Sequence, residues 1–433
     1  MRATTSGSRL AGLDVARAVA IVGMLVAHFV ALDGTGGWLR VIARAANGKA
    51  MPLFVVLGGV SFTLLTRRAA HPVAVVLGRA AFLLAVGLVM SEHVPLIAVI
   101  LHFYAAYFVV GLLVRRLPTP ALPALAAAVM IAGAYTWQHV APGADTYRGW
   151  QGWATLRHPM PLLSDLFVSG LYPVLPSFAF FVVGMWLGRL SLGDTTVARK
   201  IVVGGLLCTV VGFGLGGLLE QKLTDRSLIE SRSGQLELTP KAAAIVRAFR
   251  PDPTEFEAFV DAEVRRRGES RRRILEDLVV AYERALHQAP MTRWFDTLGH
   301  GNMPAWVVGA NGLAAFVIGA SLLAMRVMPT VLRPVAALGR LALTAYVAQG
   351  AVLRWWYPKH ALAVGFYGEL WLVVAMTVAF MAFATSWLRV VRQGPVEAVL
   401  RVAGDASVAV RTGRQKHDGP PPGRVTASSQ GER

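Results

Sequence analysis

The sequence has little charge and almost no cysteine. Only 16% of its 433 residues are charged, whereas an ordinary soluble domain has about 25%. A single cysteine excludes a disulfide scaffold, and glycine without a three-residue period excludes a collagen-like chain. The chain is instead apolar, with 55% hydrophobic residues and a mean hydropathy of +0.52. This composition indicates a membrane protein and excludes intrinsic disorder.

Long apolar runs predict an all-α, polytopic membrane bundle. A spanning helix needs about 20 mainly apolar residues, and ten such runs are visible. Because the runs are continuous rather than alternating, they favour helices over the strands of a closed barrel. The predicted spans are Leu13–Leu32, Ala50–Thr66, Ala74–Ser91, Val94–Val114, Pro120–His139, Leu166–Leu190, Ile201–Leu219, Met303–Met325, Pro334–Arg354 and Gly365–Leu388.

Positive charge predicts the orientation of these spans. The formal net charge is +18, but the arginines lie mainly between apolar runs and in the tail. This pattern indicates membrane topology and attraction to anionic lipid headgroups, not nucleic-acid binding. Short loops on one side carry pairs such as Arg67–Arg68 and Arg115–Arg116. The positive-inside rule therefore predicts that both termini are cytosolic.

One long segment between the spans is not apolar. Residues 220–302 hold 14 Lys or Arg and 14 Asp or Glu, which predicts a soluble helical insert on the extracytoplasmic side. The predicted organisation is a membrane part over 1–219 with seven spans, the insert over 220–302, a membrane part over 303–390 with three spans, and a cytosolic, basic, partly disordered tail over 391–433.

The first predicted helix contains three ionisable residues, each of which costs about 2.5–3.5 kcal/mol inside a bilayer. Asp14 and Arg17 are three residues apart and are expected to pair on one face. His28 follows Arg17 by eleven residues, which places the two about 20° apart around the axis and about 16 Å apart along it. A topology-anchoring ion pair and a histidine bound by a neighbouring helix are the structural alternatives.

Other polar residues fall at two depths. Several lie toward the outer face and suggest a water-accessible region, with headgroup-level solvation as the alternative; they include His93, His102, His300, Asn302 and Gln349. Toward the cytosol, Arg79 and Arg340 join Arg17. These arginines are candidates either for snorkelling or for holding phosphates. No metal-ligand spacing is present in the sequence.

Four stretches of the sequence resemble a known family. The opening Arg9–Arg17, followed by ten residues and His28, resembles the Arg-x10-His signature of the integral-membrane acyltransferase superfamily. This superfamily includes the acyltransferase-3 and heparan-α-glucosaminide N-acetyltransferase-like proteins. The other three stretches, Pro52–Ser61, Gly339–Tyr346 and Gly394–Glu397, are similar to its YeiB-like bacterial branch, the domain of unknown function 418.

The resemblance implies an enzyme of the bacterial inner membrane. Such an enzyme moves an acyl group, such as acetyl, from cytosolic acyl-CoA to a hydroxyl or amine of an extracytoplasmic acceptor such as a glycan. The motif histidine, His28, is the implied base, and Arg17 is the implied ligand of CoA, assisted by Arg79 or Arg340. His93, His102, His300, Asn302 and Gln349 would then orient the acceptor.

The sequence also departs from the family pattern. The segment Asp33–Lys49 has no histidine, although the lysosomal acetyltransferase uses one in the corresponding loop. Gln349 stands where many relatives have histidine, and the insert Gln221–Arg293 is longer than is usual in the branch. A transporter or flippase of a small molecule, lipid or sugar remains an alternative, as does a scaffold whose insert binds a partner. The sequence leaves open whether the chain forms a homo-oligomer.

Overall fold

The structure is a computed structural model, and every regular element in the part of the chain that it describes is a helix. It describes residues 10–30, 48–94, 99–139, 156–157, 159–169, 172–219, 260–262, 264–266, 268, 270, 294–295, 303–355 and 357–417. Nearly all of the predicted insert, together with His300 and Asn302, lies outside these residues. The predicted domain boundaries therefore remain predictions.

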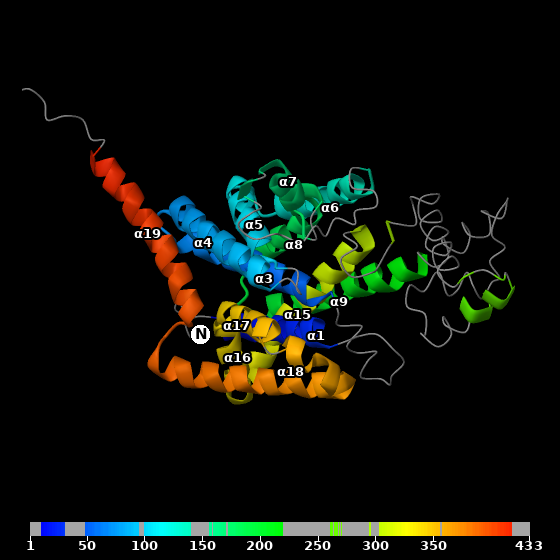
Figure 1. Ribbon diagram of the computed structural model, residues 1–433. Helices are drawn as coiled ribbons and strands as arrows, with labels where there is room; N and C mark the ends of the chain where they lie inside the picture. Colours follow the sequence, from blue (N-terminus) through cyan, green and yellow to red (C-terminus); the bar gives the residue numbers. More distant parts are fainter. Residues whose placement is uncertain are drawn as a thin grey trace, which may run out of the picture.

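The helices of residues 10–219 make up one group of elements in the bundle (Figure 1). Their lengths follow the apolar runs, because a backbone without water must bond within its own helix. They are α1 (Ala11–Phe29), α3 (Ala50–Arg68), α4 (Pro72–His93), α5 (Leu101–Val114), α6 (Ala121–His139), α7 (Pro159–Ser164), the π-helix η2 (Asp165–Ser169), α8 (Val174–Leu187), α9 (Thr195–Thr209) and the π-helix η3 (Val210–Leu215).

The helices after residue 303 pack against the helices of residues 10–219. They are α15 (Pro304–Val327), α16 (Pro329–Arg340), α17 (Ala342–Trp355), α18 (Tyr357–Val390) and α19 (Pro395–His417). We call the end of the bundle at which α1 begins the inner end, following the charge pattern of the sequence, and the opposite end the outer end. Segments far apart in the chain lie side by side, as α1 lies against both α3 and α16.

Six helices in the described part of the chain are long and apolar enough to cross a membrane. They are α1, α3, α4, α9 with its continuation to Leu219, α15, and the part of α18 from Tyr367. Three shorter apolar helices, α5, α6 and α8, lie within other predicted spans. The prediction of a helical, multi-pass membrane protein is supported, and the full set of ten spans remains a prediction.

The ninth predicted span differs from its prediction. One continuous helix was expected over Pro334–Arg354, but α16 and α17 meet at Leu341 with a bend of 68°. The backbone of Leu341, at φ −106° and ψ 29°, interrupts the helical ladder. The apolar pattern does not reveal this break, because the predicted span is apolar on both sides of Leu341. The break lies in the backbone angles of Leu341, which hydropathy does not report.

The tail also contains more structure than the sequence indicated. A partly disordered tail was predicted after residue 390, yet α19 runs from Pro395 to His417 and packs on α4. The signals for a helix were present: proline in the first turn, Glu397 soon after it, and apolar Val396, Leu400 and Ala403 at helical spacing. Figure 1 shows α19 extending beyond the end of α4.

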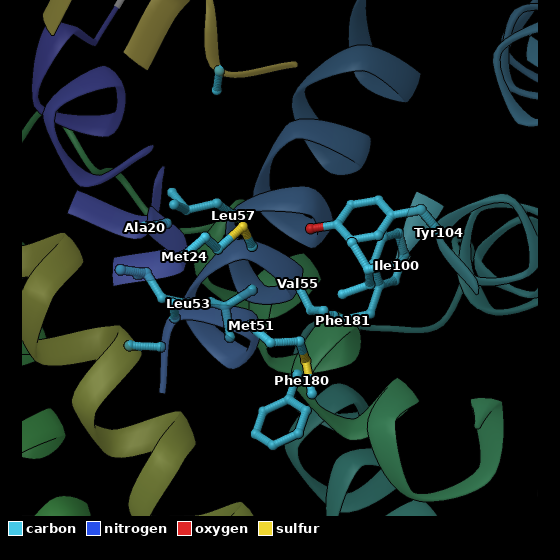
Figure 2. Packing of buried hydrophobic residues seen from close by; sticks show 14 of the residues in the cluster. Ala20, Met24, Met51, Leu53, Val55, Leu57, Ile100, Tyr104, Phe180 and Phe181 are labelled. Carbon is cyan, nitrogen blue, oxygen red and sulfur yellow. The ribbon is translucent and has the colours of Figure 1, made fainter. Parts of the chain in front are cut away.

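The core of the bundle is centred on α1. This helix packs against α3, α15, α16, α17 and α18, and Ala16, Ile21 and Leu25 on it are fully buried. Figure 2 shows Ala20 and Met24 of α1 beside Leu53 and Leu57 of α3. The buried positions of α1 are shielded from both lipid and water. A charged residue at such a position must therefore find its partner within the protein.

Arginines at the inner end bind the turns between helices. Arg189 donates to the carbonyl oxygens of Arg115 and Leu117, which lie after α5. Arg326 donates to the carbonyl oxygen of Gly193 and to the hydroxyl of Thr195, at the start of α9. The Arg189 contacts satisfy carbonyl oxygens at the end of α5, where a helix leaves such groups without an intrahelical partner, and the Arg326 contacts hold the end of α15 to the turn before α9.

Helices α3 and α8 approach closely through a pair of glycines. A Cβ at Gly59 would overlap the carbonyl oxygen of Phe181, and one at Gly184 would overlap that of Val56. Small residues at such positions allow backbones to pack closely, which favours helix association in membranes. The pair therefore fixes how near the two helices can come.

We expect Gly184→Ala to destabilise the protein by about 1–3 kcal/mol, because the added methyl group must push the two backbones apart. Thermal unfolding in detergent measures the change. Gly204→Ala is the matched control, since a Cβ there meets nothing within 4 Å and alanine gains up to about 1 kcal/mol of helix propensity. Equal melting temperatures for the two variants would contradict the prediction.

Candidate functional site

The inner half of α1 carries a buried ion pair. Arg17 Nη1 donates to Asp14 Oδ1, as the three-residue spacing predicted. The Asp14 side chain is 2% exposed, whereas that of Arg17 is 23% exposed. Arg17 Nη2 donates to Ser61 Oγ of α3 at 2.9 Å, and Ser61 Oγ donates to the carbonyl oxygen of Leu57 at 2.6 Å. Arg17 is thus held in place, and part of its side chain remains exposed.

A glycine of α16 lies directly against the backbone of α1 at Asp14. A Cβ at Gly339 would overlap the carbonyl oxygen of Asp14 and lie 3.1 Å from the amide nitrogen of Ala18. Only a residue without a side chain lets α16 come so close to α1. This contact sets the position of the α16–α17 break beside the Asp14–Arg17 pair.

A carboxylate from the tail binds the start of α17. Glu397 Oε1 accepts hydrogen bonds from the amide nitrogens of Leu343, at 2.8 Å, and Thr344, at 3.1 Å. Its Oε2 accepts one from the Thr344 hydroxyl at 2.5 Å. The four stretches that carried the family resemblance therefore meet through contacts between α1 and α3, between α16 and α1, and between α19 and α17. This convergence is a tertiary feature of sequence segments that are up to several hundred residues apart.

The three arginines predicted to hold CoA lie at different helix junctions. Arg17 lies between α1 and α3. Arg79, half-buried in α4, faces α19, where a Cβ at Gly404 would be 3.3 Å from its Nε. Arg340 Nη2 donates to the carbonyl oxygen of Arg392 at 2.8 Å, in the turn before α19. Arg17 has contacts with Asp14 and Ser61 of the motif stretches, whereas Arg79 and Arg340 face the C-terminal segment.

The outer half of the bundle holds several of the predicted polar residues. His28, in the last turn of α1, is half-buried. His102 is 1% exposed and packs against the backbone of Gly87 and the ring of Phe103. His93 is exposed at the end of α4, and its Nδ1 lies 2.9 Å from the carbonyl oxygen of Val89. Burial of His102 differs from the water-accessible position that its place in the sequence suggested.

Gln349 is fully buried on α17. Its exposed fraction is 0%, and neither its Oε1 nor its Nε2 has a hydrogen-bond partner among the residues that the structure describes. The next residue, Gly350, places it at the outer end, because a Cβ there would be 2.8 Å from Met90 Cε and 3.6 Å from Val94 Cγ2 of α4. A buried side-chain amide lowers the stability of the fold unless it forms a hydrogen bond.

Two tyrosines pack between α3, α5 and α17. Tyr104 of α5 donates its hydroxyl hydrogen to the carbonyl oxygen of Phe54 on α3, and Figure 2 shows its oxygen directed toward that helix. Tyr346, on α17, accepts a hydrogen bond from the amide nitrogen of Ile100 at 3.3 Å and stacks against Phe54. These aromatic contacts fill the space between α3, α5 and α17.

Sequence reasoning gave no individual role to Ser61, Glu397 or the two tyrosines. Ser61 and Glu397 each end a stretch that carried the family resemblance, and that position was the available signal. Their partners are 44 and 53 residues away in the chain. Periodicity and local spacing report contacts within one helix, so they cannot identify such partners.

Comparison with known proteins gives two family matches. The catalytic domain of heparan-alpha-glucosaminide N-acetyltransferase matches residues 9–209, and the protein family of unknown function DUF418 matches residues 278–405. The matches confirm the predicted resemblance to the branch of membrane proteins that combines these two families. Together with the helices of spanning length, they indicate a multi-pass membrane protein with an acetyltransferase-like domain.

A curated relative is similar over a shorter stretch. The chain is 36% identical over 80 residues to the uncharacterized protein YxaH of Bacillus subtilis (strain 168). That stretch is 17% of this chain and 19% of the relative, so the chain spans about a fifth of the relative's length. No solved structure gives a significant match.

Proposed function

We propose that the protein transfers an acetyl group from acetyl-CoA, bound at the inner end, to a hydroxyl or amine of an acceptor such as a glycan at the outer end. The observation that carries this proposal lies within residues 9–209. That acetyltransferase-like segment contains α1, on which Arg17 lies in the inner half and His28 in the last outer turn.

Arg17 has the properties needed to hold a CoA phosphate. A guanidinium carries five N–H donors, and Arg17 uses one for Asp14 and one for Ser61. Its remaining donors and its partial exposure leave room for a charge-assisted bond to phosphate. Arg79 and Arg340 are proposed to assist at the same cytosolic entrance, where they would add positive charge near the approaching nucleotide.

His28 is proposed as the general base. Its imidazole takes the proton of the acceptor hydroxyl or amine while the acceptor oxygen or nitrogen attacks the thioester carbonyl. The carbon–sulfur bond then breaks, and the CoA sulfur leaves as a thiolate that takes up a proton. Because His28 is about 16 Å from Arg17 along the helix, the extended pantetheine arm of CoA would have to carry the thioester outward between them.

The acceptor is proposed to bind among the outer polar residues. Gln349 and His102 are the buried candidates, His93 is the exposed one, and His300 and Asn302 lie outside the described residues. The acceptor side would face away from the cytosol of a bacterial cell, with both termini of the chain inside. The buried amide of Gln349 fits recognition of a sugar hydroxyl, because it offers both a donor and an acceptor.

Purified protein in lipid nanodiscs tests this function. We expect acetyl-CoA to be consumed only when an acceptor, such as an amino sugar or a glycan, is added, with acetylated acceptor detected by mass spectrometry. Absence of both turnover and acetyl-CoA-dependent stabilisation would refute the proposal. Movement of a labelled sugar into proteoliposomes without acetyl-CoA would instead support a transporter.

A further inference from the structure

The break between α16 and α17 leaves backbone amides at the start of α17 that need hydrogen-bond acceptors. A new helix begins at Ala342, and the first amides of any helix have no intrahelical acceptor. Leu341 N bonds back to Leu338 O, and Ala345 N bonds to Leu341 O. Of the three amides between them, two, those of Leu343 and Thr344, donate to Glu397. The cap of α17 is therefore supplied by a different helix, α19.

The contact is reciprocal. The Thr344 hydroxyl donates to Glu397 Oε2 and accepts a hydrogen bond from Val396 N at 3.2 Å. The first turn of α17 thus satisfies an amide of α19, while α19 satisfies two amides of α17. Each helix start depends on the other, and neither can shift along its axis without breaking these bonds.

The turn before α19 is shaped to deliver this carboxylate. A Cβ at Gly394 would overlap Glu397 Oε2 and lie 2.8 Å from Leu341 Cγ. The turn is held from two sides, because Trp387 Nε1 donates to Gln393 O at 2.8 Å and Arg340 donates to Arg392 O at the same distance. Its geometry is therefore determined by both α16 and α18.

We propose that Glu397 is a positioning residue that acts through α17. By binding the first turn of α17, it sets the placement of Tyr346 and Gln349 against α1, α3 and α5. Tyr346 follows Thr344 by two residues and contacts Phe54 and Ile100. Gln349 and Gly350 follow at the outer end, where a Cβ at Gly350 would be 2.8 Å from Met90 Cε. The role assigned here to Gln349 rests on the proposed function, whereas the placement of α17 does not.

Thiol cross-linking between the outer ends of α4 and α17 tests the placement without using activity. In the full chain with Cys208→Ser, Met90→Cys and Gly350→Cys are introduced and joined in membranes with a short bis-thiosulfonate linker, because a cysteine side chain does not reach as far as the Met90 methyl group that lies 2.8 Å from a Cβ at Gly350. Native Glu397 should give rapid cross-linking. Glu397→Ala should slow cross-linking about tenfold, because the free energy lost with a helix cap corresponds to a change of about this size in the population of the native placement. Asp405→Asn is the control, since this exposed carboxylate pairs with Arg401 at 3.6 Å, interacts with Arg79 of α4, and lies eight residues, about 12 Å, beyond Glu397 along α19; its cross-linking should be unchanged.

Two milder variants keep the test valid if Glu397→Ala does not fold. Thr344→Ala removes one hydroxyl, and Glu397→Gln keeps an oxygen that can accept from both amides. Both should slow cross-linking by less than Glu397→Ala.

Unchanged rates in all folded variants would overturn the proposal. Slower cross-linking in a protein whose wild type shows neither acetyl transfer nor stabilisation by acetyl-CoA would support the positioning role and refute the proposed function. Where transfer is measurable, Glu397→Gln should lower kcat with little change in the KM for acetyl-CoA.

Discussion

Replacing His28 with alanine is expected to lower acetyl transfer by about 10²–10⁴-fold, the usual contribution of a general base. The acceptor must lose its proton during attack on the thioester, and alanine cannot take it. Acetyl-CoA binding should persist, because the proposed phosphate ligand, Arg17, is three turns away along the same helix. Release of CoA at saturating acetyl-CoA measures the rate, and the thermal shift with acetyl-CoA measures binding.

His71→Ala is the matched control for this prediction. His71 precedes α4 at the inner end and makes no side-chain capping bond there. Its removal should leave the transfer rate near that of the wild type. If His28→Ala also retains the full rate while the protein is folded, His28 is not the base.

Replacing Arg17 with alanine should have two effects. Acetyl-CoA at about 100 times its Kd stabilises a protein by about 2.7 kcal/mol, and this stabilisation should be lost with the phosphate ligand. The unliganded protein should also lose on the order of 3 kcal/mol, because the buried carboxylate of Asp14 no longer has its arginine. Melting temperatures with and without acetyl-CoA separate the two effects.

The double variant Asp14→Asn/Arg17→Gln distinguishes binding from stability. It removes both charges, so that no carboxylate remains buried without its counter-charge, and it should recover most of the lost stability. It should still show no response to acetyl-CoA. A thermal shift that survives in either variant would contradict the role of Arg17 in binding, and equal stability of the single and double variants would contradict the structural importance of the pair.

The sequence predicted much of the membrane architecture because the bilayer imposes a simple rule. Apolar runs of sufficient length must be helical, since backbone groups in lipid have no water to bind. This rule located the helices of spanning length and their order. It did not locate the break at Leu341 or the tail helix α19, because neither depends on the length of an apolar run.

The sequence could also predict contacts within one helix but not between helices. The Asp14–Arg17 pair follows from a spacing of three residues. The bond from Arg17 to Ser61 requires α1 and α3 to lie together at one depth. His102 and Gln349 illustrate the same limit, since their depth was predicted from the spans but their complete burial depends on which helices cover them.

By itself, the sequence determined that the chain is a helical membrane protein, which charges α1 carries, and which family it resembles. Hydropathy and helical periodicity suffice for these conclusions because both are local properties. Only the tertiary structure decided that Gly339 contacts Asp14, and that Glu397 binds the start of α17. Those contacts depend on the packing of segments that are distant in the chain. In that packing, a glycine without a side chain and the free amides at a helix start matter as much as the polar side chains that the sequence displays.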